Sequence, residues 1–246
     1  MIKSVIEELL FFLRGDTNTK HLEEKGVNIW KYNTSREFLD SVKLNHYDVG
    51  DMGAMYGYQW IHYGAKYDTC NHDYSGKGVN QIDLCIDLLI NDPFSRRIIM
   101  TDFNPIQVNE GCLYPCHSII IQFYVRKLDS INYVSIQMYQ RSADMFLGIP
   151  FNILSTSLLL YIICEIINNK KGLKQYVPDK VIIILGDYHI YNEHYTQATR
   201  QLLHIPLEFP TISFNKQITD YKTITCDDIK IDNYKSYPFI NAKMIP

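Results

Sequence analysis

The sequence predicts an α+β fold in one domain that spans residues 1–246. Strand-like segments gather in the middle of the chain, and segments with helical apolar spacing lie before and after them. No internal repeat, low-complexity block or linker divides the chain. A chain of 246 residues is long enough to bury a large core, so a single α+β domain is the simplest arrangement.

The first element is a helix over residues 4–13, which the turn at Gly15 and Asp16 ends. Helical spacing places Glu8 among apolar side chains, whereas Lys3 and Glu7 can pair on the solvent side. A carboxyl with apolar neighbours has a raised pKa and can exchange protons near neutral pH. A glutamate at the edge of the helix would instead reach solvent, and this segment alone leaves both interpretations open.

The remaining elements follow from apolar periodicity and from turn residues. Residues 35–80 are polar, aromatic and rich in turn signals, so loops are expected there. The helix over 152–167 is apolar on nearly every side, which predicts that it is buried in the middle of the fold. The other expected elements are a helix over 79–91, strands over 97–101, 118–125 and 133–139, an interior strand over 180–185, a helix over 195–203, and weak strands and turns from 210 onward.

Composition narrows the class of protein. The net charge is −3 and the pI about 6.2, so no overall basic field favours nucleic acid, and a bound phosphate would need a few local arginines. The longest apolar run, 158–167, is shorter than the ~20 residues of a membrane span, and the N-terminus lacks the pattern of a secretory signal. The six cysteines form no disulfide framework, so we expect free thiols and a cytoplasmic protein.

The strongest chemical signal is the thiol of Cys116. Pro115 fixes a turn before it and an apolar strand begins after His117, so the thiol is expected at the rim of a cavity. A thiol becomes a nucleophile when a nearby cation stabilises the thiolate, and Arg141 is the candidate cation. A buried inert cysteine is the alternative. A zinc site with Cys112 is disfavoured because no second Cys/His pair lies at a matching distance, and no metal is expected.

Two further groups of polar residues are weaker signals. Arg96 and Arg97 are adjacent, so they can hold one anion only from a loop-like conformation; a solvated pair of charges is an equal alternative. His189 and Tyr191 follow the expected strand over 180–185 and offer hydrogen bonds to a polar ligand. The usual alternative is a buried histidine whose ring nitrogens form their hydrogen bonds within the core.

Taken together, these segments resemble the thymidylate synthase family over almost the whole chain. The matching motifs are Glu-Leu-Leu-x-Phe-Leu-x-Gly-Asp-Thr-Asn at 8–18, Gly-Val-Asn-Ile-Trp at 26–30, Tyr-Gly-x-Gln-Trp at 56–60, Asp-Tyr-Ser-Gly-x-Gly-Val at 73–79, Arg-Arg-Ile-Ile-Met at 96–100, Pro-Cys-His at 115–117, Tyr-Gln-Arg-Ser-x-Asp at 139–144, Leu-Gly-x-Pro-Phe-Asn-Ile at 147–153 and Gly-Asp-x-His-x-Tyr at 186–191. So many matches in one order exclude chance similarity.

The resemblance implies a large mixed sheet packed against helices, with the sheets of two subunits back to back in a homodimer. It implies reductive methylation of dUMP to dTMP, in which 5,10-methylenetetrahydrofolate gives the one-carbon unit and the hydride. In such a dimer Arg96 and Arg97 would reach across the interface and hold the phosphate in the partner's site. The family also implies a functional link, or a fusion, to dihydrofolate reductase and weak RNA binding.

The resemblance also assigns catalytic roles. The Cys116 thiolate would add to C6 of the pyrimidine, and Arg141 would lower the pKa of the thiol and bind the nucleotide phosphate, to which Ser142 adds a hydrogen bond. Glu8 would organise water and relay a proton at O4 of the base. Tyr56 would lie near the proton removed from C5.

Other matched residues would bind the substrates. Asn152 resembles the amide that reads N3–H and O4 of uracil, and His189 and Tyr191 would bind the deoxyribose hydroxyl. Asp144 resembles the carboxylate that hydrogen-bonds the folate pterin. The folate cavity would be lined by Ile29, Trp30, Asn33, Gly148 and Phe151.

The sequence departs from the family at both ends. The family begins with a strand and an arginine-containing loop that covers the phosphate, and Met1 stands after both. The tail 243–246 stops short of the small apolar ending that closes the family's site. These departures leave open a catalytically impaired relative that only binds nucleotide or RNA. The other alternative is a deoxycytidylate hydroxymethylase, which would carry a carboxylate in place of Asn152, whereas Asn152 favours uracil.

Overall fold

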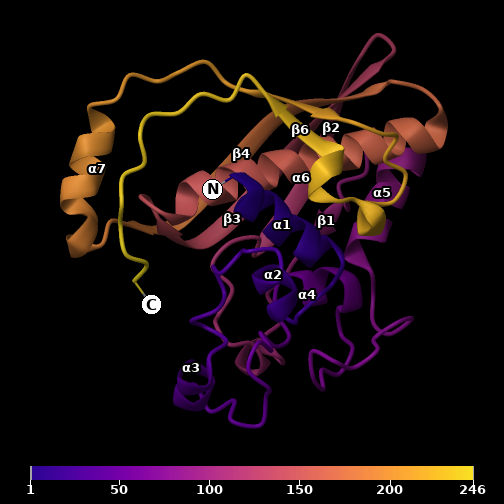
Figure 1. Ribbon diagram of the computed structural model, residues 1–246. Helices are drawn as coiled ribbons and strands as arrows, with labels where there is room; N and C mark the ends of the chain where they lie inside the picture. The colour runs from indigo at the N-terminus through magenta and orange to yellow at the C-terminus, as the bar shows by residue number, and fades with distance from the viewer. Residues whose placement is uncertain (1, 246) are drawn as a thin grey trace.

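The computed structural model describes residues 2–245. Figure 1 traces the chain from the indigo N-terminal helix to the yellow C-terminal segment. The elements in chain order are α1 (Ile2–Leu13), α2 (Lys20–Glu23), α3 (Arg36–Ser41), α4 (Gly57–His62), α5 (Gln81–Asn91), β1 (Ile99–Met100), η1 (Val108–Glu110), β2 (Ile120–Leu128), β3 (Ile131–Asp144), α6 (Gly148–Lys171), β4 (Tyr176–His189), η2 (Asn192–His194), α7 (Tyr195–Leu202), β5 (Thr211–Phe214), η3 (Tyr221–Thr223), η4 (Cys226–Asp228) and β6 (Ile229–Asp232).

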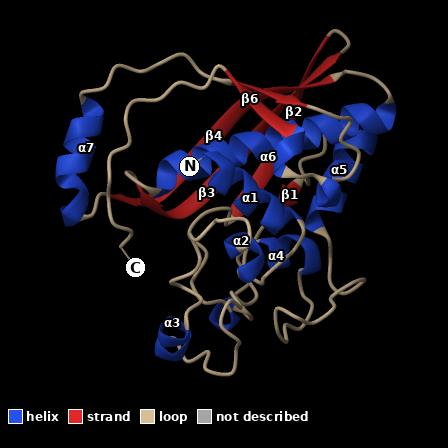
Figure 2. Cartoon of the chain, in the orientation of Figure 1, coloured by secondary structure: helices blue, strands red, loops and turns tan. Residues whose placement is uncertain are grey.

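A mixed four-stranded sheet in the order β1-β2-β3-β4 organises the molecule. β1 and β2 pair antiparallel, as do β2 and β3, whereas β3 and β4 are parallel. Parallel neighbours need a crossover, and α6 supplies it between β3 and β4. Figure 2 shows α6 and α1 lying over the strands, so the predicted α+β class with a mixed sheet packed against helices is confirmed.

Helix α6 is the central helix of the core. The structure confirms the predicted burial, because most of its apolar side chains contact the sheet or neighbouring helices. By length and composition alone α6 could cross a membrane, but 61% of its most apolar window is buried within the described chain. It begins at Gly148 and ends at Lys171, where Gly172 adopts a left-handed φ of 66° that suits glycine.

Helix α1 packs on α4 and α6 through its apolar side chains. At Gly57, the first residue of α4, an added Cβ would lie 2.3 Å from the carbonyl oxygen of Phe12, so the two backbones meet directly. Glu7 was expected on the solvent side with Lys3. It is instead 5% exposed, and its carboxylate lies 2.6 Å from Nζ of Lys25.

The two faces of the sheet differ. Inward residues of β3 such as Val134, Ile136 and Met138 are fully buried under the helices. On the other face, aligned positions of the neighbouring strands expose apolar side chains. These exposed residues, called the bare face below, are Ile99, Ile120, Tyr124, Tyr139, Ile182 and Ile184.

Several expected elements need correction. The strand expected over 180–185 is not interior, because β4 pairs only with β3 among residues 2–245 and runs on to His189. The segment 35–80 contains two short helices, α3 and α4, and is not only loops. Expected strand 97–101 is reduced to the two residues of β1, because Arg96 and Arg97 lie in a turn before it. α7 stands apart from the sheet beside the C-terminal segment in Figure 1.

Candidate active site

Cys116 and Arg141 lie together, as the sequence predicts. Cys116 is half-buried in the loop before β2, and Nη2 of Arg141 lies 3.8 Å from its Sγ. Two backbone bonds fix this pair, because the amides of Arg141 and Ser142 donate to the carbonyl oxygen of Cys116 at 2.8 and 3.3 Å. Nε of Arg141 also donates to the carbonyl of Pro115 at 3.1 Å. The guanidinium is therefore held where it can stabilise a thiolate.

Two opposing effects act on the pKa of Cys116. Burial raises the pKa of the thiol above its ordinary value, and this effect outweighs the lowering by Arg141. The direction of the arginine effect is the expected one. The free site thus holds mainly the thiol, and Arg141 reduces the cost of forming the thiolate.

Glu8 is the buried carboxyl that the apolar side of α1 predicts. It is 9% exposed, and Nε1 of Trp30 donates a hydrogen bond of 2.8 Å to its Oε1. Burial raises the pKa of Glu8 to about 7, although the Trp30 hydrogen bond opposes the shift. The alternative of a solvent-exposed glutamate is excluded, and Glu8 can take or give a proton near neutral pH.

Tyr56 contacts both α1, which carries Glu8, and the loop that carries Cys116. Its hydroxyl accepts a hydrogen bond of 3.1 Å from the amide of Cys116. Its ring lies between Phe12 at 4.8 Å and His117 at 4.7 Å, both stacked. Its φ is 46°, a conformation that costs a non-glycine residue about 1–3 kcal/mol unless its surroundings hold it. Burial lowers the pKa of His117 to about 4, so this ring is neutral at neutral pH.

Asn152 lies in the first turns of α6 and is 8% exposed. Its Oδ1 accepts a hydrogen bond of 2.9 Å from Nε2 of Gln140, which also donates to the carbonyl of Ser142 at 3.0 Å. A side-chain amide both donates and accepts, and this bond sets which end of Asn152 is the acceptor. Gln140 received no role from the sequence, although it lies inside a quoted motif.

The ends of β3 and β4 bring further predicted residues together. Asp144 pairs in register with His189, and Ser142 with Asp187. His189 is partly exposed and bonds Oδ1 of Asp187 through Nδ1 at 2.9 Å, so it is not enclosed in the core. The Tyr191 ring packs edge-on against it at 5.1 Å. The charges of Asp144 and Cys116 add to burial in raising the pKa of Tyr191, which places all three within electrostatic reach.

Asp144 has a local structural role as well. Its Oδ1 accepts from the amides of Phe146 and Leu147 at 3.0 and 3.3 Å, which orders the turn before α6. A Cβ added to Gly148 would lie in ordinary contact with Asp144 and Asn152, so this glycine borders both. A carboxylate with one oxygen used locally retains its second oxygen as an acceptor.

The residues expected to line a folate cavity fall into two groups. Trp30 and Asn33 are buried and Ile29 is partly buried, and the Trp30 ring lies edge-on to Tyr56 at 5.7 Å. Gly148 and Phe151 are partly exposed at the start of α6. Both groups therefore border elements that carry Glu8, Tyr56 and Asn152.

Arg96 and Arg97 do not join these residues. Both are exposed in the turn between α5 and β1, and neither makes an ion pair within residues 2–245. The turn conformation meets the condition for both guanidiniums to face one anion, although Arg97 was expected to begin a strand. Their charge is directed outward from this chain.

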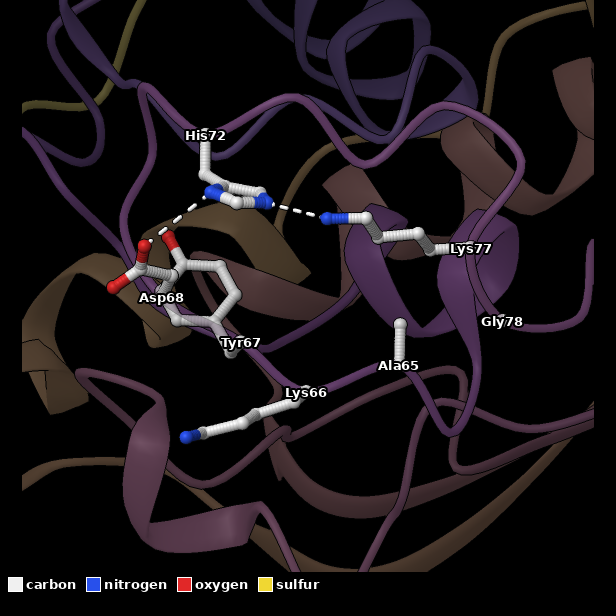
Figure 3. A pocket seen from close by; sticks show the side chains of 7 residues that line it. All are labelled: Ala65, Lys66, Tyr67, Asp68, His72, Lys77 and Gly78. Atoms are coloured by element: carbon white, nitrogen blue, oxygen red, sulfur yellow. Dashed lines mark hydrogen bonds and ion pairs between the residues drawn. The ribbon is translucent and has the colours of Figure 1, made fainter.

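Two open hollows of about 620 and 630 Å³ lie elsewhere. The first lies along residues 65–78, and the second lies between residues 14–17, residues 61–80 and Lys222. Neither is lined by a predicted site residue. Figure 3 shows the first, where His72 bridges Asp68 and Lys77. No group of three or more His, Cys, Asp or Glu side chains in residues 2–245 has the arrangement of a metal site.

Comparisons with known proteins agree with the geometry around Cys116. A family model described as thymidylate synthase matches residues 1–246. A probable thymidylate synthase of Schizosaccharomyces pombe is 43% identical over 99% of this chain and 39% of its own length. A bifunctional dihydrofolate reductase-thymidylate synthase of Zea mays is 42% identical over 98% of this chain and 44% of its own length. A thymidylate synthase of Herpesvirus ateles is 40% identical over 98% of this chain and 79% of its own length.

The first of these relatives are much longer proteins, and the chain spans less than half of the fungal and maize relatives. None of the three names mentions a deoxycytidylate hydroxymethylase, so that alternative gains no support. The match of the family model to the full sequence, together with the contact between Cys116 and Arg141, shows that this chain belongs to the thymidylate synthase family.

Proposed function

We propose that this chain forms one catalytic domain that converts dUMP to dTMP with 5,10-methylenetetrahydrofolate as co-substrate and dihydrofolate as second product. The observation that carries the proposal is the contact of Arg141 with the thiol of Cys116, beside a buried carboxyl that titrates near neutral pH. A thiol, a fixed cation and a proton-exchanging acid are the groups that addition to an unreactive pyrimidine requires.

The reaction begins at C6 of the base. The thiolate of Cys116 forms a bond to C6, and the electrons of the C5–C6 double bond move toward O4, where Glu8 supplies a proton through water. C5 then attacks the folate methylene carbon while one of its two bonds to folate nitrogen breaks. The C5 proton leaves near Tyr56 as the second carbon–nitrogen bond breaks, which leaves a methylene group on C5 and releases tetrahydrofolate. Hydride transfer from tetrahydrofolate to this methylene forms the methyl group and dihydrofolate, and the electrons displaced toward C6 expel the sulfur and restore the C5–C6 double bond.

Binding roles follow from the same geometry. Arg141 and Ser142 lie where a phosphate can be held, and His189 and Tyr191 offer hydrogen bonds to a sugar hydroxyl. The Asn152 amide, oriented by Gln140, can donate to O4 and accept from N3–H, a pattern that uracil presents and cytosine does not. Asp144, Ile29, Trp30, Asn33, Gly148 and Phe151 are the proposed folate contacts.

The working unit is proposed to be a homodimer joined through the bare face. A large exposed apolar sheet face favours burial against a second copy, and a two-fold axis would repeat the same contacts on both subunits. The unpaired, outward-directed Arg96 and Arg97 would then complete the partner's phosphate site.

Other proposed partners have less support. Dihydrofolate must be reduced before folate is used again, and the maize and Paramecium tetraurelia relatives are named as bifunctional with dihydrofolate reductase, so we propose a link to that activity. Six unpaired cysteines favour a reducing, cytoplasmic location. Weak RNA binding is retained only as a secondary proposal, because the net charge is −3.

Two assays test this function. Purified protein with dUMP and methylenetetrahydrofolate should form dihydrofolate, seen by its absorbance, and release tritium from C5-labelled dUMP. A folded dimer that binds dUMP without either signal would favour the impaired binding protein. Release from labelled dCMP alone would favour the hydroxymethylase, and Asn152→Asp should shift preference toward dCMP.

A further inference from the structure

The second hollow, called the cation hollow below, is bordered by charged residues that the proposed mechanism does not use. Its volume is about 630 Å³, and Arg14, Lys77 and Lys222 all line it. These three residues belong to segments that lie far apart in the sequence. None of them forms an ion pair with a carboxylate within residues 2–245. Three positive charges without a direct anionic partner therefore border one open space.

Hydrogen bonds hold the segments that carry Arg14 and Lys222. Tyr221, next to Lys222, is 3% exposed, and its hydroxyl donates to Oδ1 of Asp83 at 2.9 Å. Nη1 of Arg14 donates to the carbonyl oxygen of Ile224 at 3.4 Å, so the end of the first helix and the segment 221–224 lie side by side. The two cations are thus placed on adjoining walls before any ligand binds.

Lys77 is placed by the packing of its loop on the end of α4. A Cβ added to Gly78 would lie 2.4 Å from the carbonyl oxygen of His62, and Nδ1 of His62 donates to the carbonyl of Lys77 at 3.1 Å. Nζ of Lys77 donates to Nε2 of His72 at 2.7 Å, as Figure 3 shows, and a ring nitrogen that accepts belongs to a neutral imidazole. Asp68 lies on the far side of this ring, 3.3 Å from Nδ1, so the charge of Lys77 has no direct counter-ion.

Two carboxylates also line the cation hollow, but both bond to their own segments. Oδ1 of Asp16 accepts from the amide of Asn18 at 2.9 Å, and its Oδ2 lies 2.7 Å from Nδ1 of His21. Oδ1 of Asp73 accepts from the amide of Ser75 at 2.9 Å. These oxygens order local turns and are not paired with the three cations. The cation hollow therefore favours an anionic ligand.

We propose that the cation hollow binds an oligophosphate, a diphosphate or triphosphate group that is either free or carried on a nucleotide. Phosphate oxygens suit both an arginine fork and lysine ammonium groups. The charges come from three separate walls, so a chain of phosphates can meet more of them than a single phosphate can. Neither Cys116 nor Arg141 lines this hollow, so binding there does not need the proposed substrate site.

Calorimetric titration with inorganic pyrophosphate tests the site through variants. Arg14→Gln combined with Lys222→Gln should weaken binding by about tenfold, because each exposed charge pair contributes up to about fivefold. Lys174→Gln is the matched control, since this exposed lysine lies outside the hollow and also has no ion pair within residues 2–245; it should bind as the parent does. Equal affinity in the parent and the double variant would overturn the proposal. So would binding that only Arg141→Gln removes.

A second measurement uses the parent protein and does not depend on how a variant folds. Pyrophosphate should slow the acetylation of Lys77 and Lys222 by acetic anhydride about threefold or more, and should leave Lys174 unchanged, as read on peptides by mass spectrometry. The same protection at lower concentrations of ATP would identify a nucleotide as the carrier, and equal concentrations would identify the free oligophosphate. Protection of neither lysine by either compound would overturn the proposal.

This inference goes beyond the proposed conversion of dUMP, and the two can fail separately. Pyrophosphate bound at Lys77 and Lys222 of a protein that forms no dihydrofolate would support the cation hollow and overturn the proposed reaction. An active enzyme whose lysines are not protected would do the reverse.

Discussion

Both faces of the sheet carry apolar side chains, but those on one face are buried and those on the other are exposed. Met138 on β3 is fully buried under the helices, whereas Ile184 on neighbouring β4 is 45% exposed on the bare face. On the covered face of β3, Gln140 is buried and bonds Asn152, and the backbone amides of Arg141 and Ser142 hold the loop of Cys116. The covered face therefore supports the residues around Cys116 and Asn152, and the bare face is the surface proposed for a second copy.

The largest expected effect tests the covered face. Cys116→Ser should lower dTMP formation by about 10³-fold or more, because a hydroxyl is a far weaker nucleophile than a thiolate. Stability should change by less than about 1 kcal/mol, since the thiol is only half-buried. Dihydrofolate absorbance and urea unfolding measure the two quantities. Activity within tenfold of the parent would remove Cys116 from its role.

The next effect tests the bare face. Ile182→Lys with Ile184→Lys should convert a dimer to monomers, because an unpaired charge buried in the interface costs about 3–5 kcal/mol. Sedimentation measures the mass, and activity should fall with it if Arg96 and Arg97 serve the partner. Ile106→Lys is the control, because this isoleucine is 89% exposed away from the sheet. Unchanged mass in the double variant would place the interface elsewhere.

A core substitution sharpens the comparison. Met138→Ala should destabilise the protein by about 2–5 kcal/mol, because the covered face cannot collapse around the lost side chain. The effect should not depend on protein concentration. Ile184→Ala should lower stability in a concentration-dependent way, because its contacts would form only between subunits. Urea unfolding at two protein concentrations distinguishes the two faces.

The smallest effect concerns pH. The pKa of Glu8 in the folded protein is about 7, against an ordinary value of 4.5. Its burial therefore lowers the free energy of unfolding as the pH rises between these values. Glu8→Gln should reduce this loss by about 1–3 kcal/mol between pH 5 and 8. Urea unfolding across that range is the measurement. A variant with the parental slope would show that Glu8 does not titrate as proposed.

The sequence predicted the elements whose apolar pattern is long. α1, α5, α6 and the paired strands were expected. The burial of Glu8 was one of two interpretations that its place on α1 left open. The helices α2, α3 and α4 were missed because four to six residues are too few to show helical periodicity. β4 was expected in the interior because its aliphatic run is typical of a strand that is buried on both faces. The pattern is the same whether those faces are buried by one chain or by two.

The missed residues depend on tertiary contacts. Glu7 is buried because Lys25, distant in sequence, pairs with it. The net pKa of Cys116 required weighing burial against Arg141, which spacing cannot supply. Gln140 did leave a signal, since it is a polar residue in an expected strand at a position whose alternate neighbour, Met138, is apolar and buried.

The contact of Gly57 with Phe12 has a consequence for how heat inactivates the protein. α1 carries Glu8 and α4 follows Tyr56, so the meeting of these backbones sets the spacing of two groups that are proposed to act in catalysis. A bulkier residue at 57 would force the helices apart and disturb the hydrophobic core in the same step. Heating should therefore abolish catalysis and the native fold in one transition, with no long-lived compact but inactive species between them.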